Sequence, residues 1–176
     1  SRPYMQLSFS YTFQKENDET FCAYTVPYSY TALQTHLKHL KLLVQKEKFD
    51  FIRFESLGLS LGGIDVPFLK ISNKNEDTEV HDDKPIIVVI GRQHPGETHS
   101  SFIIHGFVNY LMSRDPLSHK FRDRYETWVL PIVNPDGVVT GNYRSNLQGK
   151  DMNRNFYSED DKECKERVYE VEMIRA

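Results

Sequence analysis

The feature that most constrains the fold is an unbroken run of β-branched apolar residues, Ile-Ile-Val-Val-Ile, at positions 86–90. Such a run has no polar face, so it predicts a central strand of a parallel sheet, covered on both sides. Apolar residues then recur at helical spacing from Ile103 to Met112, and Thr98 or Ser100 can cap that helix. Strand, loop and helix in this order predict an α/β fold.

Other segments predict further elements of both kinds. Clean alternation from Met5 to Phe13 and a β-prone run at 21–26 predict an antiparallel hairpin. Thr31 and Gln34 form a capping box for a helix whose apolar stripe extends to Val44. Further strands are expected at 51–61, 66–72 and 128–133, and a last helix around Cys164, Val168 and Val171. Pro131 favours a bulge or an edge position for the 128–133 strand. The expected fold class is therefore α/β, with a mixed, largely parallel sheet flanked by helices and preceded by a short antiparallel β piece.

Composition and charge limit the class of protein. The chain has 176 residues, 39% hydrophobic and 27% charged, which is typical of a folded protein with one main domain. Its 22 basic and 25 acidic residues give a net charge of −3, so no overall positive field would attract nucleic acid or anionic lipid. Two distant cysteines and the lack of a signal peptide or long apolar span favour a cytoplasmic location. Because the chain starts at Ser1 and stops at Ala176 inside a helical pattern, we expect it to be part of a longer protein.

His94-Pro95-Gly96-Glu97 directly follows the buried strand. A histidine and a glutamate three residues apart can bind one metal ion, and the carboxyl end of a central strand is where open α/β sheets bind ligands. Gly91 and Gly96 would let the backbone take the tight path that points both side chains the same way. The pair by itself also occurs by chance, so the rest of the sequence has to support it.

Polar motifs downstream provide that support. Asn134-Pro135-Asp136-Gly137 has ideal turn residues, and Arg144 and Arg154 follow in loop-like sequence. Arginines in such sequence are usually solvated surface charges. A guanidinium group can also form two parallel hydrogen bonds to a carboxylate, and beside a metal it can polarise a carbonyl group.

The four motifs at 94–101, 134–137, 141–144 and 153–156, in this order, resemble those of the M14 zinc carboxypeptidases. Within that family they look like the cytosolic carboxypeptidases, the deglutamylase group. The resemblance extends upstream to Pro27-Tyr28-Ser29-Tyr30-Thr31. It implies that residues 1–27 are the end of an amino-terminal β-domain and that residues 28–176 are the amino-terminal part of the zinc carboxypeptidase domain.

The resemblance also implies a role for each matching residue. His94 and Glu97 would bind Zn²⁺, which activates a water molecule; Arg144 would polarise the scissile carbonyl, and Asn153 and Arg154 would hold the terminal carboxylate of the substrate. The implied reaction releases one terminal amino acid. In the cytosolic group this is typically glutamate, from polyglutamate side chains or acidic tails of tubulin and other proteins. No nucleic-acid or membrane partner is expected.

The sequence departs from the family pattern in one respect. A third zinc ligand, a histidine, and a general-base glutamate are expected further downstream, yet no histidine follows His119. The glutamates between Glu159 and Glu172 fit a solvated helix face better. His99 and His105 could replace the missing ligand, although packed or polar helix residues are the simpler interpretation. We therefore expect the 176-residue chain to bind zinc weakly and to be inactive by itself.

Two other functions fit part of the sequence. One is a non-catalytic interaction protein that keeps a peptidase-like half-domain, since folds outlast their chemistry. The other is a related zinc hydrolase that acts on acylated amino acids. The β-prone segment and the Pro-Tyr-Ser-Tyr junction upstream favour the carboxypeptidase.

Overall fold

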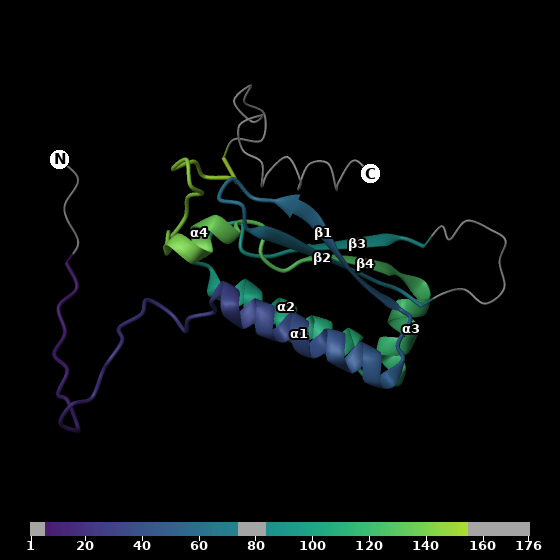
Figure 1. Ribbon diagram of the computed structural model, residues 1–176, viewed down its shortest axis with the longest axis horizontal. Coiled ribbons are helices and arrows are strands. Elements are labelled where there is room, and N and C mark those ends of the chain that lie inside the picture. The colour runs from purple at the N-terminus through teal and green to yellow at the C-terminus, as the bar shows by residue number, and fades with distance from the viewer. Residues whose placement is uncertain (1–5, 74–83, 155–176) are drawn as a thin grey trace.

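The computed structural model describes residues 6–73 and 84–154, in which four strands form one mixed sheet (Figure 1). They are β1 (Ile52–Leu59), β2 (Asp65–Ile71), β3 (Ile86–Ile90) and β4 (Glu126–Leu130), in the order β1-β2-β4-β3. The pairs β1–β2 and β2–β4 are antiparallel and the pair β3–β4 is parallel. The expected mixed α/β architecture is confirmed, but in the described part of the chain the sheet is not largely parallel.

The β-branched run forms β3, although its position differs from the expected one. Among the described residues β3 pairs only with β4, and Ile86 is 49% exposed. The interior strands are β2 and β4 instead, and Val129 and Leu130 of β4 are fully buried. Because β4 ends at Leu130, Pro131 lies just beyond the strand, so neither the expected bulge nor the expected edge position is needed.

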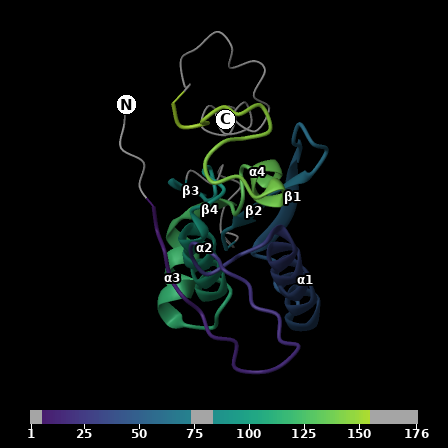
Figure 2. The ribbon, with the colours of Figure 1, turned by 90° about the vertical axis from the view of Figure 1, so that its left-hand side faces the viewer.

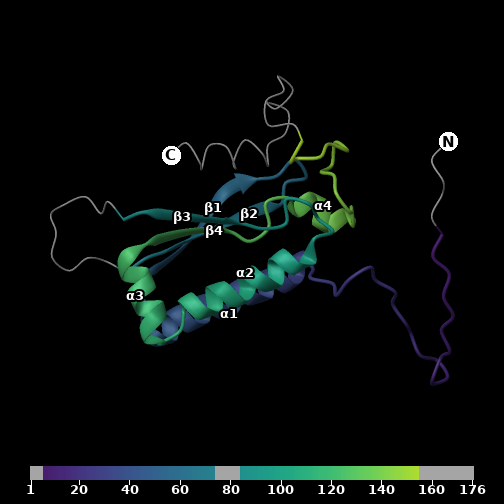
Figure 3. The ribbon, with the colours of Figure 1, turned by 180° about the vertical axis from the view of Figure 1, so that it is seen from behind.

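Two long helices, α1 (Tyr30–Glu47) and α2 (Thr98–Leu111), lie on one face of the sheet (Figure 3). The N-cap of α1 is Ser29, whose Oγ accepts a hydrogen bond from Ala32 N at 3.1 Å, so the helix starts earlier than a cap at Thr31 predicts. Its expected apolar stripe is confirmed. The core between these helices and the sheet contains Leu33, Leu37, Leu40, Leu69, Ile71, Ile104, Val108, Leu111 and Val129. Burial of each such side chain contributes about 1.5–3 kcal/mol to folding.

Two shorter helices lie at opposite ends of the sheet (Figure 1). α4 (Pro135–Thr140) begins at the motif expected to be a turn, and the Asn134 side chain accepts a hydrogen bond from Gly137 N at 3.0 Å. α3 (Pro116–Arg124) was not expected from the sequence; it is capped by Asp115, whose carboxylate accepts from Leu117 N at 2.7 Å.

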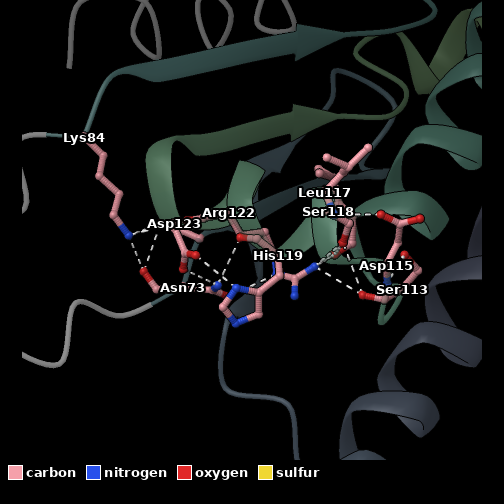
Figure 4. Close-up of polar contacts among 11 residues, drawn as sticks. Asn73, Lys84, Ser113, Asp115, Leu117, Ser118, His119, Arg122 and Asp123 are labelled. Atoms are coloured by element: carbon pink, nitrogen blue, oxygen red, sulfur yellow. Dashed lines mark hydrogen bonds and ion pairs between the residues drawn. The ribbon is translucent and has the colours of Figure 1, made fainter.

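Beside α3, a polar group that we call the Lys84 cluster joins two chain segments (Figure 4). Lys84 Nζ donates to Ser72 Oγ at 3.1 Å and to the carbonyl oxygen of Asn73. The Asn73 side chain donates to Asp123 Oδ1 at 2.7 Å and accepts from Arg122 Nε at 3.0 Å. The residues on either side of 74–83 are therefore fixed to the same helix.

The segment before α1 contains no strand between residues 6 and 29 (Figure 2). The side chains of the alternating run, Leu7, Phe9, Tyr11 and Phe13, are all exposed. The expected antiparallel hairpin is therefore not formed in the described residues. The last predicted helix lies outside the described residues. No helix in residues 6–73 and 84–154 has the length and apolar character needed to cross a bilayer.

Candidate active site

The loop after β3 carries His94 and Glu97 and is held by main-chain hydrogen bonds to the chain that follows β4. Gly91 N donates to Leu130 O at 2.8 Å, and Val133 N donates to Gly91 O at 3.0 Å. The two chain segments leaving the parallel pair β3–β4 therefore stay together beyond the strands. This places the loop at the carboxyl end of β3, as the sequence predicts.

His94 lies between two carboxylates and is only 6% exposed. Its Nδ1 is 3.1 Å from Glu97 Oε1, and its Nε2 is 2.8 Å from Asp151 Oδ1. A carboxylate accepts hydrogen bonds, so the simplest tautomer has the proton on Nε2, where it is donated to Asp151. The lone pair of Nδ1 then faces the Glu97 oxygen.

In that tautomer Nδ1 and the Glu97 oxygen are two acceptors 3.1 Å apart, an arrangement that a shared cation stabilises; with the proton on Nδ1 the same contact is a hydrogen bond to Glu97. An imidazole nitrogen and a carboxylate oxygen are common zinc donors, and two donors of one tetrahedral zinc ion lie about 3.4 Å apart, so this pair fits zinc. A carboxylate behind the far nitrogen of a ligating histidine is a usual outer partner, which fixes the tautomer and the ring orientation. Within residues 6–73 and 84–154, no three His, Cys, Asp or Glu side chains are grouped so that they could hold a metal ion.

Asp151 connects the histidine to the remaining candidate residues. It accepts from Arg144 Nε at 2.5 Å through Oδ2 and from Asn153 N at 2.9 Å through Oδ1. Burial raises the pKa of this carboxyl group, but hydrogen bonds from His94, the Asn153 amide and Arg144 outweigh it, so the pKa lies below its usual value. Asp151 is therefore ionised at neutral pH.

The structure brings His94, Glu97 and Arg144 together and places Asn153 beside them through its amide. The Arg144 side chain is 40% exposed, so it is fixed by Asp151 and still accessible from solvent. Arg154 is exposed, and its Nη1 donates to Asn153 O at 2.9 Å. The predicted residues thus form one group on two loops, with Arg154 at its margin.

The sequence model of the zinc carboxypeptidase family matches residues 37–171. The chain belongs to the zinc carboxypeptidase family.

Several relatives and solved structures agree with this assignment. Human cytosolic carboxypeptidase 4 is 38% identical over 160 residues, which are 88% of this chain and 14% of that protein. Mouse cytosolic carboxypeptidase 6 is 37% identical over 150 residues, 85% of this chain and 27% of that protein. The crystal structure of a metallo-carboxypeptidase from Burkholderia cenocepacia matches with a TM-score of 0.72 and 27% identity, over 85% of this chain and 38% of that one. The chain therefore spans between about a seventh and a quarter of the length of these curated relatives.

Zinc is the metal of this family, and the donor pair His94 and Glu97 fits it. The two other histidines considered as ligands point elsewhere. His99 is exposed on α2, and His105 Nδ1 is 3.1 Å from the hydroxyl of Tyr28. The His105 ring also stacks on His36 of α1, with 3.4 Å between ring centroids. Neither residue belongs to the group around His94.

The loop that carries Arg144 is shaped by two asparagines that the sequence analysis did not single out as functional. Asn146 is fully buried, and its side chain accepts from Gln148 N at 3.0 Å and from Lys150 N at 3.1 Å. Asn142 Nδ2 donates to Ser145 O at 3.0 Å. These contacts hold the chain on both sides of Arg144. The abundance of Asn and Gly in this stretch was the available signal for such a loop.

The two loops contact each other closely at Gly96. Its amide donates to Tyr143 O at 2.7 Å, and a Cβ atom at position 96 would lie 2.5 Å from the Tyr143 ring. Gly91 is similarly confined by Ile104 and Pro131. Both glycines are required, as expected, but the reason is close approach of neighbouring atoms: neither has a positive φ.

Proposed function

We propose that the protein carrying this chain is a zinc metallocarboxypeptidase of the cytosolic type that removes glutamate residues from carboxyl termini or polyglutamate side chains. The observation that carries the proposal is the arrangement of His94, with Glu97 Oε1 at 3.1 Å on one ring nitrogen and Asp151 Oδ1 at 2.8 Å on the other. A ligating histidine backed by a carboxylate is typical of a catalytic zinc site.

Each side chain has a distinct task in this proposal. Bound zinc would supply a water molecule whose pKa is lowered towards about 7. Arg144, fixed at its Nε by Asp151, would direct its guanidinium group at the scissile carbonyl and stabilise the negative charge that develops there. Asn153 and Arg154 would hold the terminal carboxylate, because an amide and a guanidinium group are good donors to a carboxylate.

The preference for glutamate is proposed from the resemblance to the cytosolic group, whose relatives are 35–38% identical to this chain. Substrates would then be proteins or peptides with acidic tails or glutamate side chains, tubulin among them. The names of those relatives also support a cytoplasmic location for this protein.

We also propose that residues 1–27 belong to a β-domain that precedes the peptidase domain. The support is the alternating run with Leu7, Phe9 and Tyr11, whose apolar side chains are exposed and would be buried on pairing with further strands. Limited proteolysis of a longer version of the protein tests this: cleavage at many sites within residues 6–27 would contradict a folded β-domain there, and cleavage confined to the region near residue 28 would support the boundary.

The activity is tested on a longer protein that contains this chain, with peptides ending in several glutamates. Release of glutamate, lost in His94→Ala and Arg144→Ala, supports the proposal, whereas release of lysine from a matched basic peptide at the same rate would refute glutamate preference. Hydrolysis of an acetylated amino acid but not of the peptide would favour the acyl-amino-acid hydrolase. The 176-residue chain is expected to show no turnover by itself, and turnover that depends on His94 would refute that expectation.

A further inference from the structure

Arg92 occupies an unusual position between β3 and His94. It is 4% exposed, although arginine is seldom fully buried, and its backbone has a φ of +52°, a conformation that residues with a side chain rarely adopt. The chain therefore keeps a buried charge and an unfavourable backbone conformation two residues before a candidate metal ligand.

The guanidinium group of Arg92 donates to three different parts of the chain. Nε and Nη2 both donate to the carbonyl oxygen of Pro95, at 2.9 and 2.5 Å. Nη1 donates to Tyr28 O at 2.8 Å and to Ser101 Oγ at 3.1 Å. A planar fork with several donors is needed to reach these acceptors together, and lysine has no such geometry.

The acceptors show that the Arg92 guanidinium group fixes the loop that carries His94 and Glu97. Pro95 lies between His94 and Glu97, so the fork holds the main chain between the two candidate zinc ligands. The Arg92 amide donates to Ser100 Oγ at 3.1 Å, and Ser100 Oγ donates to Glu97 O at 2.8 Å, which fixes the far end of the loop. Through Tyr28 the same side chain joins this loop to the segment before α1.

We propose that Arg92 is a positioning residue that sets the distance between His94 and Glu97 and couples it to the chain before α1. Its relevance to zinc rests on the proposed function, but its effect on the loop does not. Without the fork, the Pro95 carbonyl loses two donors and the loop can relax from the path that the positive φ at Arg92 imposes. The two ligands would then meet a metal ion in many arrangements instead of one.

A second buried arginine provides a matched control (Figure 4). Arg122 is also 4% exposed and donates to the carbonyl of Leu111, to Ser118 Oγ and to Asn73 Oδ1. It lies on α3 and belongs to the Lys84 cluster, at the end of the sheet opposite α4 (Figure 1). Replacement of Arg122 should weaken the fold without changing the metal loop.

The experiment compares Arg92→Lys with Arg122→Lys in the 176-residue chain by amide hydrogen exchange without metal. We expect the Gly96 and Glu97 amides to exchange about tenfold faster, relative to β4 amides, in Arg92→Lys only; the ratio to β4 removes any change in global stability. Zinc titration against a chelator should show about tenfold weaker binding in the same variant, the range seen for outer-shell residues. Equal relative acceleration in both variants would overturn the proposal.

A third variant tests the guanidinium group itself. Arg92→Gly keeps the backbone path, because glycine accepts φ of +52°, and leaves space for a small cation. Millimolar guanidinium should restore slow exchange at Gly96, whereas tetramethylammonium at the same ionic strength should not. Failure of guanidinium to restore it would show that Arg92 does not act through these hydrogen bonds. If the longer protein releases no glutamate but the exchange results hold, the proposed function fails and the positioning role stands.

Discussion

The contact between the two active-site loops is tested most directly by Gly96→Ala. An added Cβ would lie 2.5 Å from Tyr143 Cδ2 and 2.7 Å from Tyr143 O. The ring is exposed and can turn away, but the carbonyl belongs to a loop that Asn142 and Asn146 hold from inside. The loops must therefore separate.

The size of the effect follows from two contributions. Overpacking at a contact that cannot yield costs about 1–3 kcal/mol. Loss of the hydrogen bond from Gly96 N to Tyr143 O, 2.7 Å long, adds about 1 kcal/mol. We therefore expect Gly96→Ala to lower the free energy of unfolding by about 2–4 kcal/mol. Because Arg144 follows Tyr143, the variant should also lose peptidase activity in the longer protein.

Gly106→Ala is the matched control. Gly106 lies in α2, and a Cβ there meets no atom within 4 Å, so alanine should stabilise the helix by about 1 kcal/mol. Urea denaturation, followed by far-UV circular dichroism, gives both free energies of unfolding. The reasoning is refuted if the free energy of unfolding of Gly96→Ala is within about 0.5 kcal/mol of the wild-type value, which is the range of ordinary surface substitutions. It is also refuted if Gly106→Ala lowers the free energy of unfolding more than Gly96→Ala does.

Three further predictions concern polar groups of the site and of the core. Asp151→Asn should weaken zinc binding by about tenfold in a chelator titration, because an amide cannot accept from both His94 and Arg144 as the carboxylate does; unchanged affinity would contradict that role. Asp136→Ala should lower the free energy of unfolding, measured by urea denaturation, by about 2–4 kcal/mol, because Ser60 Oγ at 2.7 Å and the Gly62 amide at 2.9 Å lose their acceptor. A decrease below about 0.5 kcal/mol would be inconsistent with the structure. Burial lowers the pKa values of His36 and His105 below their usual value of about 6.5, so the unfolded chain binds more protons and stability should fall as the pH drops below about 6.5. A double His→Gln variant that loses as much stability between about pH 7 and 5 as wild type would exclude these two groups as the cause.

Local patterns in the sequence predicted local features well. The apolar stripe of α1 and the two strands joined by Gly62-Gly63 depend on residues that are close in the sequence, and both form as expected. His94 and Glu97 lie in contact, and their role as zinc ligands stays a prediction. The motif order around Arg144 also pointed to a group that the structure brings together. These features depend on spacing, which a single sequence displays directly.

Features that depend on distant partners were missed. Asp151 lies 57 residues from His94, so nothing near the histidine indicates their contact. The position of β3 depends on which strands pair with it, and its apolar run does not specify them. The run at 5–13 alternates and the run at 21–26 is β-prone, but in the described residues neither forms a strand. The sequence analysis did not single out Arg92, because only the fold shows that three acceptors converge on it.

The Lys84 cluster has a practical consequence for work on this protein. It fixes Asn73 and Lys84 to α3, so the chain enters and leaves residues 74–83 at nearly the same place. When the ends of a segment are held together, doubling its length costs only about 0.6 kcal/mol of closure entropy. A fluorescent or affinity tag inserted between these two residues would therefore be attached at the amino end of β3, a full strand away from His94, and would leave the metal loop untouched.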